Sequence, residues 1–97
     1  MMATEPEREP LVVMATTRYL KEVKRVRKRG KDTARLIEVV DVLRNRRSLE
    51  VRHRDHALTG NWKGWRECHV EPDWLLFYQT TEAELILGRT GTHSDLF

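Results

Sequence analysis

The stretch that decides the fold is residues 65–79, WRECHVEPDWLLFYQ. Two runs rich in strand-favouring residues, Trp65–Glu71 and Trp74–Gln79, flank the dipeptide Pro72-Asp73. Proline fixes φ and aspartate tolerates turn geometry, so this dipeptide is typical of a tight turn between strands. We therefore predict a β-hairpin centred on residues 72 and 73.

Two further strands lie outward from this hairpin. A strand is predicted over Glu84–Thr90, followed by the tail Gly91–Phe97, and the apolar run Leu11–Ala15 predicts another near the N-terminus. Residues 48–64 are polar and rich in turn residues, which indicates a surface loop.

Between the first strand and this loop, apolar residues recur at helical spacing in two segments. Thr17 is a suitable N-cap for the first helix, Gly30 ends it, and Asp32 can cap the second. The apolar stripes are Tyr19, Leu20, Val23 and Val26 in the first helix, and Leu36, Val39, Val40 and Leu43, widened by Ile37 and Val42, in the second. We expect an αα-hairpin.

This order of elements predicts an α+β arrangement: a strand and a two-helix hairpin, then a three-stranded antiparallel sheet packed on the helices. A chain of 97 residues is too short to divide its core, which excludes a multidomain enzyme. We expect a single domain over residues 11–97, preceded by an acidic N-terminal extension, residues 1–10.

Positive charge is concentrated in the helical segment. Residues 18–47 hold twelve basic and four acidic side chains, whereas the whole chain has a formal net charge of only +3. Such a block attracts polyanions, either phosphate backbones or an acidic protein segment. It is also compatible with the solvated face of an amphipathic helix, but its density favours a binding surface.

The single cysteine and the lack of long apolar runs indicate the cellular compartment. Cys68 is the only cysteine, which excludes an internal disulfide, fits a reducing compartment and indicates a structural thiol. The acidic N-terminus lacks the basic start and apolar run of a signal peptide, and no apolar run approaches the roughly 20 residues that cross a bilayer. We expect a cytoplasmic protein without membrane contact.

The second half of the chain carries all four histidines, His53, His56, His69 and His93. Imidazole titrates near neutrality, so two rings that face one cleft can take and give protons in one turnover. Cleavage of RNA through its own 2′-hydroxyl needs a base, an acid and a cation, and arginine matches phosphate oxygens in bidentate fashion. No metal is required for this chemistry in principle.

Strand alternation brings some of these residues together. In the first hairpin strand, Glu67, His69 and Glu71 share one face, so Glu67 and His69 can meet a common substrate. The same parity places Arg89 on the face of Leu87, unless twist or a bulge at the strand end redirects it.

A zinc site is a rival interpretation of the histidines. His53 and His56 could combine with His69 or Cys68, but the spacings match no zinc signature, and Cys68 and His69 would point to opposite faces of a strand. Any single histidine is also more often structural than catalytic.

The aromatic residues allow two interpretations as well. Trp62, Trp65 and Trp74 are typical of packing, although Trp74 is also a candidate for substrate contact. Phe97, at the end of the chain, can stack on an RNA base or simply pack.

Three motifs occur together and in order: Asp-His-x-Leu-x-Gly-x-Trp from residue 55, His-Val-Glu-Pro-Asp-Trp from residue 69, and Arg-Thr-Gly-Thr-His from residue 89. With these motifs the chain resembles the YafQ branch of the RelE/ParE toxin superfamily, the ribosome-dependent mRNA endonucleases of bacterial type II toxin–antitoxin systems. The resemblance covers residues 11–97 and is looser over the helices.

The resemblance implies roles for individual residues. The positions that match the family's active site are His56, Glu67, His69, Asp73 and His93, with Arg89 as the phosphate-stabilising arginine and Phe97 as the terminal aromatic. Glu67 stands where the motif has aspartate, and its additional methylene moves the carboxylate by about an ångström or more. The resemblance also implies the RelE-like fold, mRNA in the ribosomal A site as substrate, and no metal or other cofactor. It further implies a small antitoxin through whose complex operator DNA is bound.

We therefore predict a metal-independent mRNA endonuclease toxin that leaves a 2′,3′-cyclic phosphate and a 5′-hydroxyl. His93 with His56 or His69 would transfer the protons, oriented by Asp73 and Glu67, while the basic helices would contact rRNA or an acidic antitoxin segment. One alternative is a non-catalytic or decayed RelE-fold protein that binds rRNA or an antitoxin. Another is the gyrase-directed branch of the superfamily, which would not be expected to keep these histidines.

Overall fold

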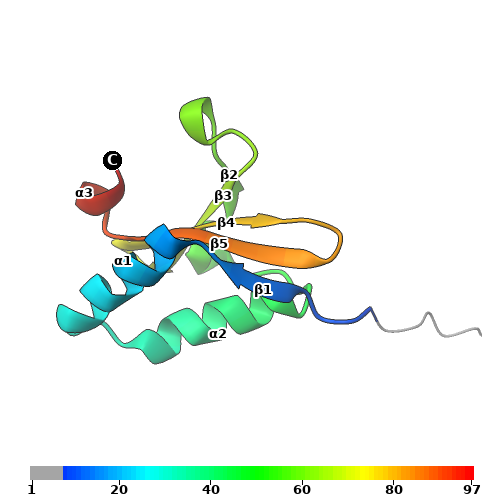
Figure 1. The fold of residues 1–97 in the computed structure, drawn as a ribbon, viewed down its shortest axis with the longest axis horizontal. Coiled ribbons are helices and arrows are strands. Elements are labelled where there is room, and N and C mark those ends of the chain that lie inside the picture. Colours follow the sequence, from blue (N-terminus) through cyan, green and yellow to red (C-terminus); the bar gives the residue numbers. More distant parts are fainter. Residues whose placement is uncertain (1–7) are drawn as a thin grey trace, which may run out of the picture.

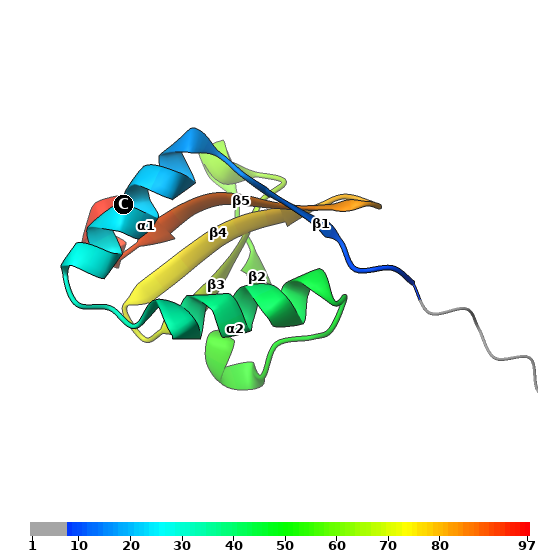
Figure 2. The same ribbon diagram turned by 60° about the horizontal axis from the view of Figure 1, so that its bottom comes forward.

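In the computed structural model, which describes residues 8–97, two helices cover one face of a mixed β-sheet (Figure 1). The helices are α1 (Thr17–Lys28) and α2 (Thr33–Arg44), and both lie in front of the sheet in Figure 2. The one-turn helix α3 (His93–Leu96) packs on the opposite face. The predicted α+β class is confirmed.

Five strands form the sheet, in the order β1-β5-β4-β3-β2. Their bounds are Val12–Ala15 for β1, His56–Ala57 for β2, Arg66–Glu71 for β3, Trp74–Thr80 for β4 and Glu84–Gly91 for β5. β1 runs parallel to β5, and the other neighbours are antiparallel. The hairpin β3–β4 forms as predicted, but β1 and β2 enlarge the sheet beyond the three antiparallel strands expected.

Residues 48–64, predicted to form a surface loop, contain short elements of secondary structure. They contain β2 and two 3₁₀ turns, η1 (Val51–His53) and η2 (Gly60–Trp62). The loop prediction is wrong for β2, because two residues are too few to show the alternation by which a strand is recognised.

Both helices begin at residues whose side chains cap them. Oγ1 of Thr16 accepts a hydrogen bond from the backbone N of Tyr19 at 3.1 Å, so the cap lies one residue before the predicted Thr17. Asp32 caps α2 as predicted. Gly30 follows α1 at φ +87°, a left-handed conformation that glycine adopts without strain, and this ends the helix.

The apolar stripes of the helices are narrower than predicted. Leu20 and Ile37 are 52% and 66% exposed. Each comes one residue after a buried position, Tyr19 or Leu36, and is therefore turned about 100° away from the sheet. The two exposed side chains border an apolar groove of about 500 Å³ between α1 and α2.

Two cores lie on the two faces of the sheet. The larger one, between the sheet and the helices, contains Leu11, Tyr19, Val26, Leu36, Val39, Leu43, Cys68, Val70, Trp74, Leu76, Tyr78, Leu85 and Leu87. The smaller one, under α3, contains Leu75, Phe77 and Leu96, with Leu58 and Trp62 at its margin. Burial raises the pKa of the Cys68 thiol, which agrees with a structural role.

A bulge at the end of β3 corrects one prediction. The register shifts between His69 and Glu71, so the alternation of side chains is broken there. The Glu71 carboxylate lies 3.5 Å from Nζ of Lys31 and 3.6 Å from Nε of Arg35, among the residues of the helical layer. The prediction that Glu71 shares a face with Glu67 and His69 is therefore wrong.

A second bulge redirects Arg89. Tyr78 pairs with Leu87 and Phe77 pairs with Arg89, so Gly88 is an additional residue in β5. A Cβ on Gly88 would lie only 2.4 Å from the ring of Trp65, which explains why glycine occupies the bulge. Arg89 consequently projects from the same face of the sheet as Phe77, and Leu87 from the other face. The possibility that a bulge redirects Arg89 is therefore confirmed.

None of the helices formed by residues 8–97 has the length and apolar character needed to cross a membrane. Residues 1–7, most of the predicted acidic extension, lie outside the described residues, so the boundary at residue 11 stays a prediction.

Candidate active site

Four strands bring predicted site residues into one row on the face opposite α1 and α2. His56 of β2 pairs with Glu67 of β3, Glu67 pairs with Phe77 of β4, and Phe77 pairs with Arg89 of β5. Directly opposed residues project from the same face of a sheet. Three predicted site residues from distant parts of the chain, His56, Glu67 and Arg89, therefore lie in one row across the sheet, with Phe77 between Glu67 and Arg89.

Glu67 and His69 meet as alternation predicted. Oε1 of Glu67 and Nε2 of His69 are 3.4 Å apart, and both side chains are largely buried. Nδ1 of His69 lies 3.1 Å from the carbonyl oxygen of Pro72. A carbonyl only accepts, so Nδ1 donates, and Nε2 is the nitrogen that can take a proton in the neutral ring.

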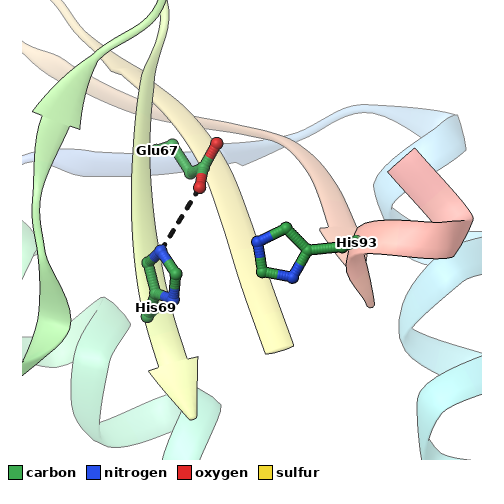
Figure 3. A group of neighbouring side chains, drawn as sticks. All are labelled: Glu67, His69 and His93. Carbon is green, nitrogen blue, oxygen red and sulfur yellow. Dashed lines mark ion pairs between the residues drawn. The ribbon is translucent and has the colours of Figure 1, made fainter. Parts of the chain in front are cut away.

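Asp73, in the turn of the hairpin, holds His93 at two points. Its Oδ1 accepts hydrogen bonds from the backbone N of His93 at 3.0 Å and from Nδ1 at 2.6 Å. These bonds lower the pKa of the Asp73 carboxyl. The other ring nitrogen of His93 points toward His69 and Glu67 (Figure 3).

The two imidazoles thus converge from β3 and α3. The ring centroids of His69 and His93 are 5.7 Å apart. The side-chain ligand atoms of Glu67, His69 and His93 all lie within 4.8 Å of one another, so these three residues could also hold a metal ion. The predicted convergence is confirmed for His69 and His93.

Phe97 adds an exposed aromatic ring beside this pair. Its side chain is 73% exposed and stacks with His93 at a centroid distance of 6.3 Å. One edge also packs on Phe77 at 5.7 Å. The Phe97 ring therefore packs on the protein at one side and still exposes a surface on which a base could stack.

Trp74 does not belong to the site. It is completely buried in the larger core, and its Nε1 donates to Oγ1 of Thr90 at 2.9 Å. The prediction that Trp74 contacts substrate is wrong, because the side chain points to the helical face of the sheet.

Arg89 is largely buried in an ion pair that the sequence analysis did not anticipate. Its Nε and Nη2 donate to the two carboxylate oxygens of Glu22 in α1, at 3.2 and 2.7 Å. Among residues 8–97, the third guanidinium nitrogen of Arg89, Nη1, has no hydrogen-bond partner. Every fully buried polar side-chain atom of these residues does have a partner, so Nη1 is not fully buried. Nη1 therefore keeps access to solvent.

The helix α3, which carries His93, is anchored by Asp95. The carboxylate accepts hydrogen bonds from Nη1 of Arg29 at 2.7 Å and from the backbone N of Thr92 at 2.9 Å. The bond from Arg29 and those from Thr92 lower the pKa of Asp95 to about 2. The C-terminal segment was predicted as a tail; the Thr92-Asp95 capping box was its only sequence signal of a helix.

The remaining two histidines differ in their roles. His56 is exposed and donates from Nδ1 to the carbonyl of Arg54 at 2.6 Å. His53 donates from Nδ1 to the carbonyl of His69 at 2.6 Å and ties η1 to β3. Cys68 lies in the core on the other face of β3, and the described residues do not bring His53 and His56 together with His69 or Cys68 as the zinc interpretation required.

Comparison with known proteins gives a consistent result. The family model described as "Bacterial toxin of type II toxin-antitoxin system, YafQ" matches residues 11–97. The mRNA interferase toxin YafQ of Escherichia coli K12 is 46% identical over 80 residues, which are 81% of this chain and 87% of the relative.

Two solved structures show the same fold. The E. coli DinJ–YafQ toxin–antitoxin complex matches with a TM-score of 0.84 and 42% identity, covering 91% of this chain and 98% of the other. A copper-bound mutant toxin from Helicobacter pylori matches with a TM-score of 0.85 and 40% identity, covering 90% and 99%.

Proposed function

The chain belongs to the YafQ family of bacterial type II toxins, and we propose from this membership and from its site that it is an endoribonuclease that cuts mRNA. The observation that carries the proposal is the pair of imidazoles, His69 and His93, 5.7 Å apart beside Glu67. Both rings donate from Nδ1 to a fixed acceptor, so Nε2 is the atom of each ring that can take or give a proton.

The proposed reaction uses the 2′-hydroxyl of the RNA as nucleophile. One neutral imidazole removes the 2′-hydroxyl proton, the 2′-oxygen attacks the adjacent phosphorus, and the bond to the 5′-oxygen breaks. The other imidazole, in its protonated form, gives its proton to that leaving oxygen. The products are a 2′,3′-cyclic phosphate and a 5′-hydroxyl. Because the two rings carry both proton transfers, we propose that cleavage requires no metal.

Neighbouring residues would support these steps. Asp73 orients His93, and Glu67, longer by one methylene than the family's aspartate, reaches to 3.4 Å from Nε2 of His69. Nη1 of Arg89 would bind a phosphate oxygen as charge builds on the phosphorus. Phe97 would stack on a base, and His56, next to Glu67 in the sheet, would contact the RNA or assist proton transfer.

The basic surface of α1 favours a substrate bound on the ribosome. Its cationic residues are exposed and leave the apolar side for the sheet: Arg18, Lys21, Lys24, Arg25, Arg27 and Lys28. Such a surface would bind rRNA phosphates and position the site at mRNA in the A site. We therefore propose ribosome dependence and action in the cytoplasm.

We also propose a small antitoxin as protein partner, since the similar E. coli toxin is solved in complex with DinJ. The apolar groove between α1 and α2, bordered by Leu20 and Ile37, fits the apolar face of an amphipathic helix. Acidic residues on such a helix would pair with the basic rim. Operator DNA would be contacted only through the toxin–antitoxin complex.

The test is incubation with programmed ribosomes in the presence of EDTA, followed by mapping of the RNA ends. We expect cuts within translated mRNA, a 2′,3′-cyclic phosphate at one end and a 5′-hydroxyl at the other. Intact mRNA would favour the non-catalytic alternative, and altered DNA topology after induction of the gene would favour the gyrase-directed one.

A further inference from the structure

Asp55 directly precedes His56, yet the two side chains lie on opposite faces of the sheet. His56 pairs with Glu67 and lies on the face of the candidate site. The Asp55 carboxylate reaches the face covered by the helices. There its Oδ1 accepts hydrogen bonds from the hydroxyl of Tyr78 at 2.6 Å and from Nε of Arg66 at 3.1 Å. No step of the proposed reaction uses this carboxylate.

The sheet fixes both donors of this network. Arg66 of β3 and Tyr78 of β4 pair with each other, and directly opposed residues project from the same face. Tyr78 is 2% exposed and belongs to the larger core, and both donors line a pocket of about 300 Å³ with Asp55 and with Leu43 of α2. Burial and the hydrogen bond to Asp55 raise the pKa of the Tyr78 phenol, so its hydroxyl stays protonated and donates. Asp55 is therefore tied to a part of the sheet that the core holds in place.

The segment that carries His56 needs such an anchor. Its strand, β2, is only two residues long and lies at the edge of the sheet. Arg54 has φ +44°, a left-handed conformation that costs free energy in a residue other than glycine. The ring of His56 is braced on this residue, because its Nδ1 donates to the carbonyl of Arg54 at 2.6 Å. A change in the backbone at Arg54 would therefore alter both the place of the ring and its tautomer.

We propose that Asp55 is a positioning residue that keeps His56 beside Glu67 in the site. The inference rests on the proposed function, in which His56 contacts the RNA or assists proton transfer. Asp55 itself touches neither the RNA nor the reacting atoms, because its carboxylate lies on the other face of the sheet, bonded to Tyr78. It acts through the place and the tautomer of its neighbour, so its loss matters only while His56 is present.

The kinetic test is a double-mutant cycle on the whole chain in the ribosome cleavage assay. Asp55→Ala should lower kcat/KM by about 10- to 100-fold, since a misplacement of about 1 Å can cost about 100-fold. The loss should fall on the same parameter, kcat or KM, as the loss in His56→Gln, and combining the two changes should cause no further loss. Tyr78→Phe removes one donor, keeps the ring in the core and should give a smaller loss of the same kind. Losses that multiply in the double variant, or that fall on different parameters, would overturn the positioning role.

Asp41→Ala is the matched control. Asp41 also lies beside an arginine, 3.8 Å from Nε of Arg44, but it is on α2 and its side chain is 67% exposed. This variant should keep the kcat/KM of the original chain. Urea unfolding of every variant gives the folded fraction, so that activity is compared per folded molecule. A loss in Asp55→Ala that disappears after this correction would overturn the positioning role and leave a purely structural one.

The tautomer of the His56 ring gives a readout that does not depend on cleavage. At about pH 8 imidazole is neutral, and ¹H–¹⁵N spectra should show the ring proton of His56 on Nδ1, as the bond to Arg54 requires. In Asp55→Ala we expect a mixture of the Nδ1–H and Nε2–H forms, with the signals of His69 and His93 unchanged. An unchanged His56 ring would overturn the proposal. A chain that cuts no mRNA, yet shows this change of tautomer, would overturn the proposed function and leave the positioning of His56 by Asp55 standing.

Discussion

Oδ1 of Asp73 accepts two hydrogen bonds from His93, one from its backbone N and one from its ring. The double contact fixes both the start of α3 and the plane of the imidazole. Asp73 lies in the β3–β4 turn and His93 is 20 positions further along the chain. The turn that decides the fold therefore also orients a proposed catalytic histidine.

Asp73→Asn should lower kcat for RNA cleavage by about 10²-fold with little change in KM. The amide keeps one acceptor oxygen, but it lacks the charge that favours the proton on Nδ1 of His93 and stabilises the ring when Nε2 is protonated. Single-turnover cleavage on programmed ribosomes is the measurement. Unchanged kcat would mean that Asp73 serves α3 alone and not the chemistry.

The anchor of α3 predicts a dependence of stability on pH. The pKa of Asp95 is lowered to about 2, below its ordinary value near 3.8, so the folded state favours the carboxylate. The stabilisation is complete above about pH 4 and is lost as the pH falls toward 2. It amounts to about 1 kcal/mol, because Arg29 is half exposed and solvent weakens the pair.

Denaturant unfolding of the original chain and of an Asp95→Asn variant between pH 2 and pH 6 measures this contribution. The difference in free energy of unfolding should be largest at pH 5 to 6 and shrink toward pH 2. A difference that is constant over this range would assign the loss to the capping bond with Thr92 and not to the charge.

Gly91→Ala should reduce both the stability of the fold and the rate of cleavage. A Cβ at this position would lie 2.9 Å from Cβ and Oδ2 of Asp95, so α3 must shift to admit it. Overpacking of this kind costs about 1–3 kcal/mol. Since His93 starts α3, we expect kcat to fall by at least about tenfold; Ser94→Ala, an exposed change in the same helix, is the control. Equal kcat in both variants would show that the position of α3 is not critical.

Local sequence signals predicted the parts of the fold that depend on near neighbours. The Pro72-Asp73 turn, the Asp32 cap and the shared face of Glu67 and His69 follow from spacing over a few residues, and all three are confirmed. The alternation holds only as far as the bulge, which is why the prediction for Glu71 is wrong.

Features that depend on distant partners could not be predicted in this way. Glu22 and Arg89 are 67 residues apart, and Arg29 and Asp95 are 66 apart, so no local pattern links them. The two-residue strand β2 shows no period of its own and forms because β3 offers a free edge.

The Glu22–Arg89 pair predicts a different balance of stability and activity for two changes. Glu22→Ala should destabilise the fold by about 3 kcal/mol or more, because it leaves the buried guanidinium uncompensated. Arg89→Lys keeps a charge near Glu22 but loses the bidentate geometry, so we expect a smaller loss of stability and a kcat at least about tenfold lower. Urea unfolding and cleavage are measured on both variants. Full activity in Arg89→Lys would remove Arg89 from the list of phosphate-binding residues.

Phe97→Ala separates stacking on RNA from packing. The ring is 73% exposed and contacts the rings of Phe77 and His93 on one side, so its removal should change the free energy of unfolding by less than about 1 kcal/mol. Loss of a stacked base costs about 1–3 kcal/mol in binding, and KM for programmed ribosomes should rise by about tenfold or more. Phe97→Trp should preserve KM because indole also stacks, whereas Phe97→Leu should behave like alanine. If leucine also preserves KM, the contribution of Phe97 is its apolar contact with Phe77 and His93, and no base stacks on it.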